Sequence, residues 1–188
     1  MIRVSGAIMG LKELLEKNKS AIVKKWIDVV FSTYPVDTSQ FLKSQTDPFA
    51  NPVGNGVSEG LHSIFDELIS DTDWKKIRLF LDPIIRVRAI QNFTPSQAVV
   101  FILPVKTIVR EKVKKHLEKD GEQKEIRVFD EKVDQLLFLA FDIFVECREQ
   151  IYSLKANEEK NKVYKAFKRA GLIAEISEEP PGLNKSTI

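Results

Sequence analysis

The chain has 188 residues, and its 29 lysines and arginines nearly balance 27 aspartates and glutamates, for a formal net charge of +2. Because the excess is small and the two signs are interleaved, the charge gives little support to a nucleic-acid partner. A composition that is 43% apolar and 30% charged indicates a globular protein, and 188 residues are enough to bury a real core. One cysteine excludes an intrachain disulfide, and one cysteine with two histidines leaves too few ligands for an ordinary structural zinc site. We therefore expect neither metal nor cofactor.

Neither a signal peptide nor a membrane span is predicted. Residues 1–10 hold too few apolar residues for the core of a signal peptide. The most apolar segment, 136–145, is about half the length needed to cross a bilayer and carries Asp142 in its middle. We interpret it as a central core helix that is buried on most sides, with Asp142 at a helix–helix contact, and we expect a cytoplasmic protein.

Helices are predicted throughout, because glycine is scarce and the β-branched runs do not alternate strictly. Apolar residues at three- and four-residue steps predict an amphipathic helix over about 11–34, either continuous or broken near Asn18 to Ser20. Pro35 ends this helix, since proline disfavours helical conformation at the preceding residue. The stretch 35–56 that follows is irregular, with a short helix at about 38–43.

Three later sites carry the same helix start signal, a capping side chain followed by proline: Asn51-Pro52, Asp82-Pro83 and Thr94-Pro95. They predict helices over about 52–70, 83–92 and 95–119, with another short helix near 73–80. Gln97 completes a capping box with Thr94. The third helix should kink at Pro104, where a backbone donor is lost.

The last helical pattern, about 123–169, is the longest, and Gly121 should end the helix before it. Its apolar stripe is interrupted by polar residues near Asn157 and then resumes, so the helix either breaks there or projects beyond the body as a charged arm. Gly171 is the expected C-terminal cap. The sequence thus predicts an all-α, single-domain helical bundle with a long C-terminal helix. Its predicted parts are an N-terminal segment 1–10, a helical sensor or interaction domain 11–170, and a disordered tail 171–188.

Few single residues indicate chemistry. His62 lies in a predicted helix, and we favour an ordinary helix histidine over a phosphoacceptor or haem ligand, because no second histidine or haem-attachment motif accompanies it. His116 suits the last turn of its helix, and Cys147 lies on an apolar stripe, as a buried structural thiol would. Gly56 and Gly60 indicate a place where another helix packs closely. No nucleophile triad, phosphate loop or dinucleotide fingerprint is present, so we predict that the chain is not an enzyme.

Arg86 and Arg88 are less routine. They are two residues apart and point about 200° away from each other around a helix, so both cannot face solvent. Arg88 follows two isoleucines by one turn, which puts it near the core, where its charge needs an anionic partner.

Two interpretations of these arginines stay open. In the first, Arg88 forms an internal ion pair, with Asp142 or Glu67 as its carboxylate. In the second, the arginines and Gln91 belong to a pocket that binds an anionic ligand or a partner's carboxylate. The candidate binding residues are Arg86, Arg88, Gln91, Phe49, Trp74 and Phe93.

Several segments together resemble a known family: Lys25-Trp26, Tyr34-Pro35, Asp47-Pro48-Phe49-Ala50-Asn51-Pro52-Val53-Gly54, Gly60-Leu61, and the run from Ile84 to Ala98 that continues to Lys106. Over about Leu11 to Tyr152 the chain resembles the N-terminal domain of RsbT co-antagonist proteins of the RsbRD type.

The resemblance implies a helical input domain of bacterial signalling, without a catalytic reaction of its own, and a globin-like packing without haem. In the co-antagonists of the stress response, such a domain is joined to a STAS domain that a partner serine kinase phosphorylates. In other members it precedes histidine-kinase or related output modules. No STAS domain follows Gly171 here, so we expect a stand-alone copy; such copies resemble proteins encoded near the membrane redox complex of dissimilatory sulfur metabolism.

Two functions from different classes follow. The first is a non-enzymatic sensory or protein-interaction domain with a protein partner in a signalling pathway, homodimeric through its last helix. The alternative is a small-ligand-binding helical protein with an Arg-lined pocket.

Overall fold

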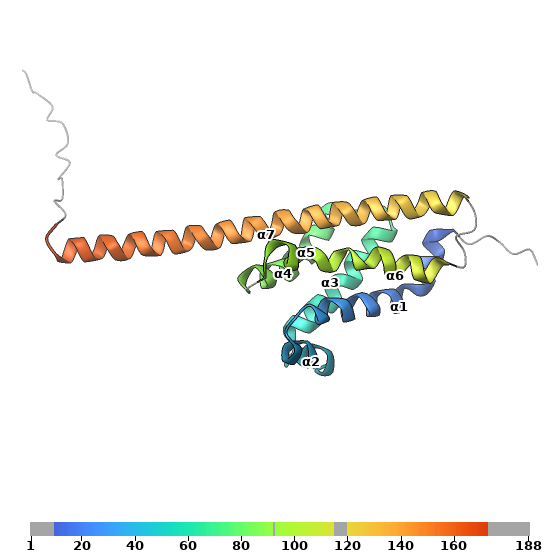
Figure 1. Cartoon of the computed structure of the whole chain (residues 1–188), viewed down its shortest axis with the longest axis horizontal. Helices are drawn as coiled ribbons and strands as arrows, with labels where there is room; N and C mark the ends of the chain where they lie inside the picture. Colours follow the sequence, from blue (N-terminus) through green and yellow to red (C-terminus); the bar gives the residue numbers. More distant parts are fainter. Residues whose placement is uncertain (1–9, 92, 115–119, 173–188) are drawn as a thin grey trace, which may run out of the picture. The chain divides into compact units, whose positions relative to one another are not determined.

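The structure, a computed structural model, describes residues 10–91, 93–114 and 120–172, and these residues form helices and turns with no strand (Figure 1). The elements in chain order are α1 (Leu11–Ser32), α2 (Val36–Ser44), α3 (Pro52–Ile69), α4 (Trp74–Ile90), α5 (Pro95–Val99), the 3₁₀ turn η1 (Val100–Ile102), α6 (Pro104–Val113) and α7 (Asp120–Arg169). The predicted all-α fold with a long C-terminal helix is confirmed. None of the helices described is long and apolar enough to cross a membrane.

The chain divides into two compact units, one that ends at Arg148 and one that starts at Glu149, so the division falls inside α7. The predicted limits of the sensor domain, 11–170, stay a prediction. Apart from Gly10, Gly171 and Leu172, the predicted N-terminal segment 1–10 and tail 171–188 lie outside the described residues.

The core of the first unit lies where α1 packs against α3 and α6, and α3 against α4. Trp26 is fully buried at its centre, and its indole Nε1 donates a hydrogen bond to the carbonyl oxygen of Phe101 at 2.8 Å. A buried indole needs such an acceptor, so this bond fixes α1 against η1 as well as filling the core. α1 is continuous, because its polar residues Asn18 to Ser20 lie on its outer side and the Asn18 side chain donates to the Leu14 carbonyl within the helix.

Asn51 caps the start of α3, as the sequence predicts, and in the structure it also joins α2 to α3. Its side-chain oxygen accepts a hydrogen bond from the Gly54 amide at 2.9 Å, while its amide nitrogen donates to the carbonyls of Leu42 and Gln45. These bonds satisfy a side chain that is almost completely buried. The cap therefore fixes both where α3 begins and where α2 lies against it.

The prediction of two separate helices over 73–80 and 83–92 is wrong. α4 runs without a break through Pro83, and its N-terminal cap is Asp73, whose carboxylate accepts from the amides of Lys75 and Lys76. Proline removes only one hydrogen bond from a helix, and α4 buries apolar side chains on both sides of Pro83, so packing outweighs the loss. Asp82 pairs with Arg86 rather than capping a helix.

The predicted helix over 95–119 is divided more strongly than a kink would divide it. The capping box of Thr94 and Gln97 is confirmed, but α5 ends at Val99 and the chain passes through η1 before α6 begins at Pro104. Proline suits the first turn of a helix because it has no amide hydrogen to lose, so Pro104 starts α6 rather than bending a longer helix. Residues 115–119, which include His116, lie outside the described part of the chain.

α7 begins at Asp120, so Gly121 lies inside it and does not end a preceding helix, contrary to the prediction. The segment 136–145 is also less buried than predicted: Phe138 is 66% exposed, Phe141 is 45% exposed, and Asp142 faces solvent rather than another helix. Within the first unit, α7 packs against the described helices through one stripe of side chains. Its opposite face is exposed to solvent even where its side chains are apolar.

α7 continues through Asn157 without a break. It ends at Gly171, whose φ of 68° is favourable only for glycine, with the Leu172 amide donating to the Phe167 carbonyl and the Gly171 amide to the Lys168 carbonyl. The predicted glycine cap is confirmed.

Of Gly56 and Gly60, the two glycines of α3 that were predicted to mark a close helix contact, only Gly60 does so. A Cβ atom on Gly60 would lie 2.9 Å from Ile84 Cδ1 and 3.1 Å from the Phe80 carbonyl oxygen, whereas a Cβ on Gly56 would have nothing within 4 Å. The absence of a side chain at Gly60 therefore sets how closely α3 and α4 approach.

We expect Gly60→Ala to lower the free energy of unfolding by about 1–3 kcal/mol, because the added methyl group collides with the backbone of α4. Gly56→Ala is the matched control on the same helix, and it should raise the free energy by up to about 1 kcal/mol, since alanine favours a helix. Urea denaturation of the two variants measures both effects. Equal effects would contradict the close contact at Gly60.

Candidate functional site

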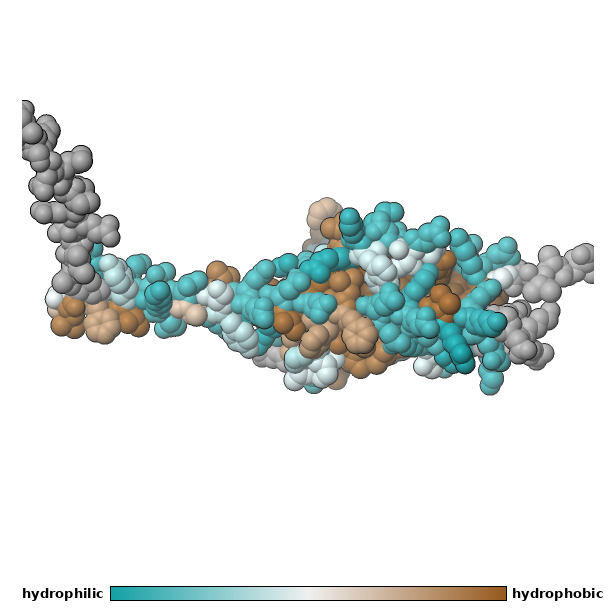
Figure 2. Space-filling view, turned by 90° about the horizontal axis from the view of Figure 1, so that it is seen from above, coloured by the Kyte–Doolittle hydropathy of each residue, from teal (hydrophilic) through white to brown (hydrophobic). Residues whose placement is uncertain are grey.

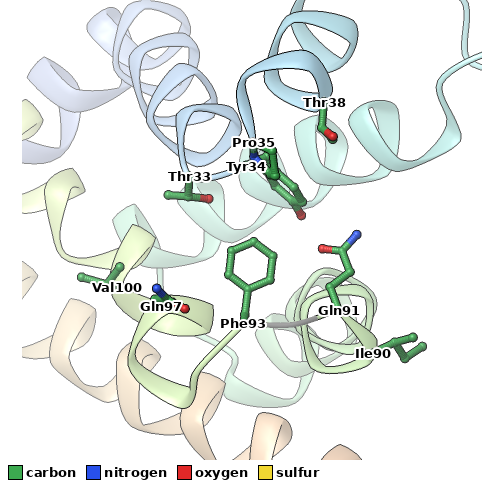
Figure 3. A pocket seen from close by; sticks show the side chains of 9 residues that line it. All are labelled: Thr33, Tyr34, Pro35, Thr38, Ile90, Gln91, Phe93, Gln97 and Val100. Carbon is green, nitrogen blue, oxygen red and sulfur yellow. The ribbon is translucent and has the colours of Figure 1, made fainter.

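A cleft of about 830 Å³ opens between the turn that joins α1 to α2 and the turn that joins α4 to α5 (Figure 3). Its size lies within the range of about 300–1,000 Å³ that is typical of small-molecule sites. Figure 3 shows the side chains of Tyr34, Phe93 and Gln91 converging at its centre. The lining is Thr33, Tyr34, Pro35, Thr38, Ile90, Gln91, Phe93, Gln97 and Val100, and none of these residues is charged.

Arg88 lies directly behind the wall of this cleft. It is 0% exposed, and its Nη2 donates to Thr33 Oγ1 at 2.7 Å and to the Gln97 carbonyl oxygen at 3.3 Å. Both acceptors belong to residues that line the cleft. The guanidinium therefore holds the end of α1 and the first turns of α5 together.

Three aromatic rings surround the same guanidinium. Its central carbon lies 4.4 Å from the ring centroid of Phe93, 4.9 Å from that of Phe101 and 5.0 Å from that of Tyr34. The rings of Tyr34 and Phe93 also contact each other edge to face, with centroids 5.4 Å apart. Aromatic faces attract a cation and offset part of its loss of water, but they leave its N–H groups without full hydrogen-bond acceptors.

Two of the three guanidinium nitrogens, Nε and Nη1, are buried without a hydrogen-bond acceptor of good geometry among the described residues. The Tyr34 hydroxyl is also buried without a partner of good geometry, although it lies beside the guanidinium and favours its charged form. No carboxylate pairs with Arg88 among the residues that the structure describes. Burial lowers the pKa of Arg88 below its usual value. A buried cation without an anion costs several kcal/mol, which makes Arg88 the most unusual group of the first unit.

The predicted ion pair of Arg88 with Asp142 or Glu67 is not formed. Asp142 is exposed on α7, and Glu67 accepts from the Asp73 amide at 3.1 Å and lies 3.6 Å from the Lys76 ammonium. Glu67 lies at the end of α3, and its carboxylate supports the start of α4 instead of pairing with Arg88.

The structure brings together only part of the predicted set of binding residues. Arg88 lies behind the cleft, and Gln91 and Phe93 line it. Phe49 is 96% exposed in the loop before α3, and Trp74 is half-buried in the first turn of α4; neither lines the cleft.

Arg86 also lies outside the cleft. It is exposed and pairs with Asp82 one turn earlier at 2.5 Å, and this hydrogen bond raises the pKa of Arg86. The predicted opposition of Arg86 and Arg88 around their helix is therefore correct, with Arg88 as the buried one.

The lining residues that the predicted set omits are Thr33, Tyr34 and Pro35 after α1, Thr38 of α2, Ile90 of α4, Gln97 of α5 and Val100 of η1. A signal was present, because the segments Tyr34-Pro35 and Ile84 to Lys106 that carry the family resemblance contain every lining residue except Thr33 and Thr38. What the sequence did not show is that these two segments meet.

The other candidates for chemistry lie apart from the cleft. His62 is exposed on α3, with its Nδ1 2.8 Å from the Ser58 carbonyl oxygen. Cys147 is buried on α7, and burial raises the pKa of its thiol. Within the described ranges, no group of three or more histidine, cysteine, aspartate or glutamate side chains is placed to hold a metal ion.

These features define a helical domain with a small-molecule-sized cleft over a buried arginine. The sequence profile of the RsbT co-antagonist protein rsbRD N-terminal domain matches residues 20–158, and the chain belongs to this family. Its membership indicates a role related to signalling. An uncharacterized protein of Archaeoglobus fulgidus is 26% identical over 149 residues, which cover 76% of this chain and 85% of that protein. No solved structure matches the chain significantly, so the globin-like packing stays a prediction.

Because Arg88 has no carboxylate partner, we expect Arg88→Met to leave the free energy of unfolding unchanged or to raise it by about 1–2 kcal/mol, as replacement of a buried charge by a similar apolar volume often does. The control Arg86→Met breaks the exposed ion pair of Arg86 with Asp82. It should lower the free energy of unfolding by at most about 0.5 kcal/mol. Denaturant titration of both variants gives the comparison. A loss of about 3–5 kcal/mol in Arg88→Met would instead indicate a buried ion pair.

Proposed function

We propose that this chain is a cytoplasmic, non-enzymatic sensory domain that receives a small ligand in the cleft and passes the signal to a protein partner. The observation that carries the proposal is the position of the cleft directly over a buried arginine that lacks an anion. Membership of the RsbRD N-terminal domain family supports a role in signalling. The lining of the cleft also contains no carboxylate, histidine, cysteine or lysine, so it offers no paired acid and base.

The cleft is well placed to affect helix packing. Its walls come from the α1–α2 turn, the α4–α5 turn and the helix residues next to these turns. Thr33 of the first turn and Phe93 of the second both contact Arg88. A ligand that binds one arrangement of these turns more tightly than another shifts the population toward that arrangement. A partner protein that contacts the same helices can then distinguish the free from the occupied state.

Filling the cleft tests this proposal. Thr38 is exposed on α2 and lines the cleft, so Thr38→Trp should block it with little effect on the core. Thr107→Trp is the matched control, because Thr107 is exposed on α6 and does not line the cleft. In a thermal-shift screen of small metabolites, ligands should raise the Tm of the wild type and of Thr107→Trp by several degrees but not that of Thr38→Trp. A ligand at about 100 times its Kd adds about 2.7 kcal/mol to stability. A broad screen in which no compound distinguishes the variants would count against a ligand site.

A second observation favours a homodimer. From Tyr152 to Leu172 every side chain is exposed, and several of these are large and apolar: Tyr152, Leu154, Val163, Tyr164, Phe167 and Leu172. Figure 2 shows such apolar side chains in brown at the C-terminal end of α7. A helix gains little stability without packing of an apolar face. We propose that a second copy of the chain supplies that packing.

Size-exclusion chromatography with light scattering should therefore find a dimer for the full chain and a monomer for a chain truncated after Leu154. Val163→Asp should shift the full chain toward monomer, because it puts a charge on the apolar face of α7. Asn161→Asp is the control, since it adds the same charge at a polar position and should leave the dimer intact. A wild-type chain that is monomeric at all concentrations would exclude the dimer.

A further inference from the structure

The chemistry of the ligand can be read from the groups that the cleft leaves unsatisfied. Among the described residues, Arg88 finds acceptors only for Nη2, so one N–H on Nε and two on Nη1 have no well-placed acceptor there. The hydroxyl of Tyr34, a lining residue, lies beside the guanidinium and has no hydrogen-bond partner of good geometry in the same part of the chain. Protein interiors rarely leave buried donors unpaired, and here they gather at one wall of one cleft. They indicate an acceptor that comes from outside the chain.

The charge of the site limits that acceptor to a monoanion. Arg88 supplies one positive charge behind the wall, and none of the lining residues supplies another. A phosphate ester carries about −1.5 to −2 charges at neutral pH and would leave excess negative charge in the site. A carboxylate carries a single charge, and its two oxygens match the spacing of guanidinium donors.

The rest of the cleft is suited to an apolar body. Pro35, Ile90 and Val100 line it together with the rings of Tyr34 and Phe93. Its volume of about 830 Å³ is much larger than a carboxylate group needs. The hydroxyl of Thr38 and the amide of Gln91 provide polar contacts at the lining.

Access to Arg88 requires a movement of aromatic rings. Phe93 lies in the turn between α4 and α5, is half-buried, and lies below Tyr34 and beside Gln91 in Figure 3. Its ring contacts both the Arg88 guanidinium and the Tyr34 ring. A change of its side-chain rotamer moves this ring away from the guanidinium without breaking a backbone hydrogen bond.

We propose that the cleft binds a small organic monocarboxylate, that Arg88 recognises the carboxylate group, and that the rings of Phe93 and Tyr34 separate to admit it. This assignment rests on the proposed function of the cleft as a ligand site. The carboxylate takes the free donors of Arg88, and the apolar body lies against the rings and Ile90. The ligand thereby acts on the same guanidinium that holds Thr33 and Gln97, which links binding to the ends of α1 and α5.

Isothermal titration of the full chain with matched acids and amides tests the assignment. The probes are phenylacetate against phenylacetamide and benzoate against benzamide, with inorganic phosphate as a further anion. In the wild type each acid should bind on the order of 10- to 100-fold more tightly than its amide, because a charge-assisted hydrogen bond is replaced by a neutral one. Arg88→Met should abolish this preference, and Arg86→Met should keep it.

A second measurement does not depend on any variant. Buried Nε–H protons exchange slowly, so in ¹⁵N-arginine-labelled wild type the Arg88 Nε–H signal should be visible at neutral pH. It should shift on addition of an acid and stay in place on addition of the amide.

The possible failures are distinguishable. If acid and amide bind the wild type equally and Thr38→Trp blocks both, the cleft is a ligand site as proposed but Arg88 does not recognise a carboxylate. Binding of phosphate in preference to both acids overturns the ligand class. If none of the probes binds and the Nε–H signal does not move, the inference is overturned, and the metabolite screen decides separately on the broader proposal.

Discussion

The guanidinium of Arg88 is the group around which the first unit is arranged. It is fully buried, it bonds to oxygens of Thr33 and Gln97, and it lies against the rings of Tyr34, Phe93 and Phe101. These residues follow the end of α1 or belong to the stretch from α4 to η1, so one positive charge brings these parts of the chain together. Yet a buried cation without an anion destabilises a fold. The rest of the core has to supply the stability that Arg88 does not.

That stability comes from ordinary packing and from well-made helix starts. Trp26 fills the centre of the core and bonds to the Phe101 carbonyl, which places η1 and its neighbours beside α1. Gly60 allows α4 to pack closely on α3 through Ile84. Arg88 lies one turn after Ile84 on the same face of α4, so the contact at Gly60 also directs the arginine inward. The position of the charge is thus a consequence of how the two helices meet.

A destabilising buried charge is typical of a site that stability alone did not shape. The cleft over Arg88 has the size of a small-molecule site, none of its lining residues in the described part of the chain is charged, and two turns form part of its walls. Turns rearrange at a lower free energy than packed helices do. Membership of the RsbRD N-terminal domain family indicates a role related to signalling, in line with the proposal that occupation of the cleft shifts the positions of α1 and α5.

The sequence by itself determined the features that depend on residues close together in the chain. The caps at Asn51 and Thr94 and the glycine at 171 each act within a few residues, and the apolar periodicity showed which of Arg86 and Arg88 is buried. Short motifs such as Tyr34-Pro35 and the run from Ile84 to Ala98 also carried the resemblance to the family to which the chain belongs.

The tertiary structure decided the features that depend on which helices and side chains, distant in the sequence, contact each other. α4 runs through Pro83 because packing on both sides outweighs one lost hydrogen bond, and packing cannot be read from a local start signal. Phe138 and Phe141 are exposed although their segment is the most apolar of the chain, because only one face of α7 has a neighbour. Above all, the sequence indicated that a buried Arg88 needs a partner, but it did not show that Thr33 accepts its hydrogen bond. Thr33 lies 55 residues away in the chain. Which side chains meet at a buried charge is set by how distant helices pack, and only the folded chain brings them together.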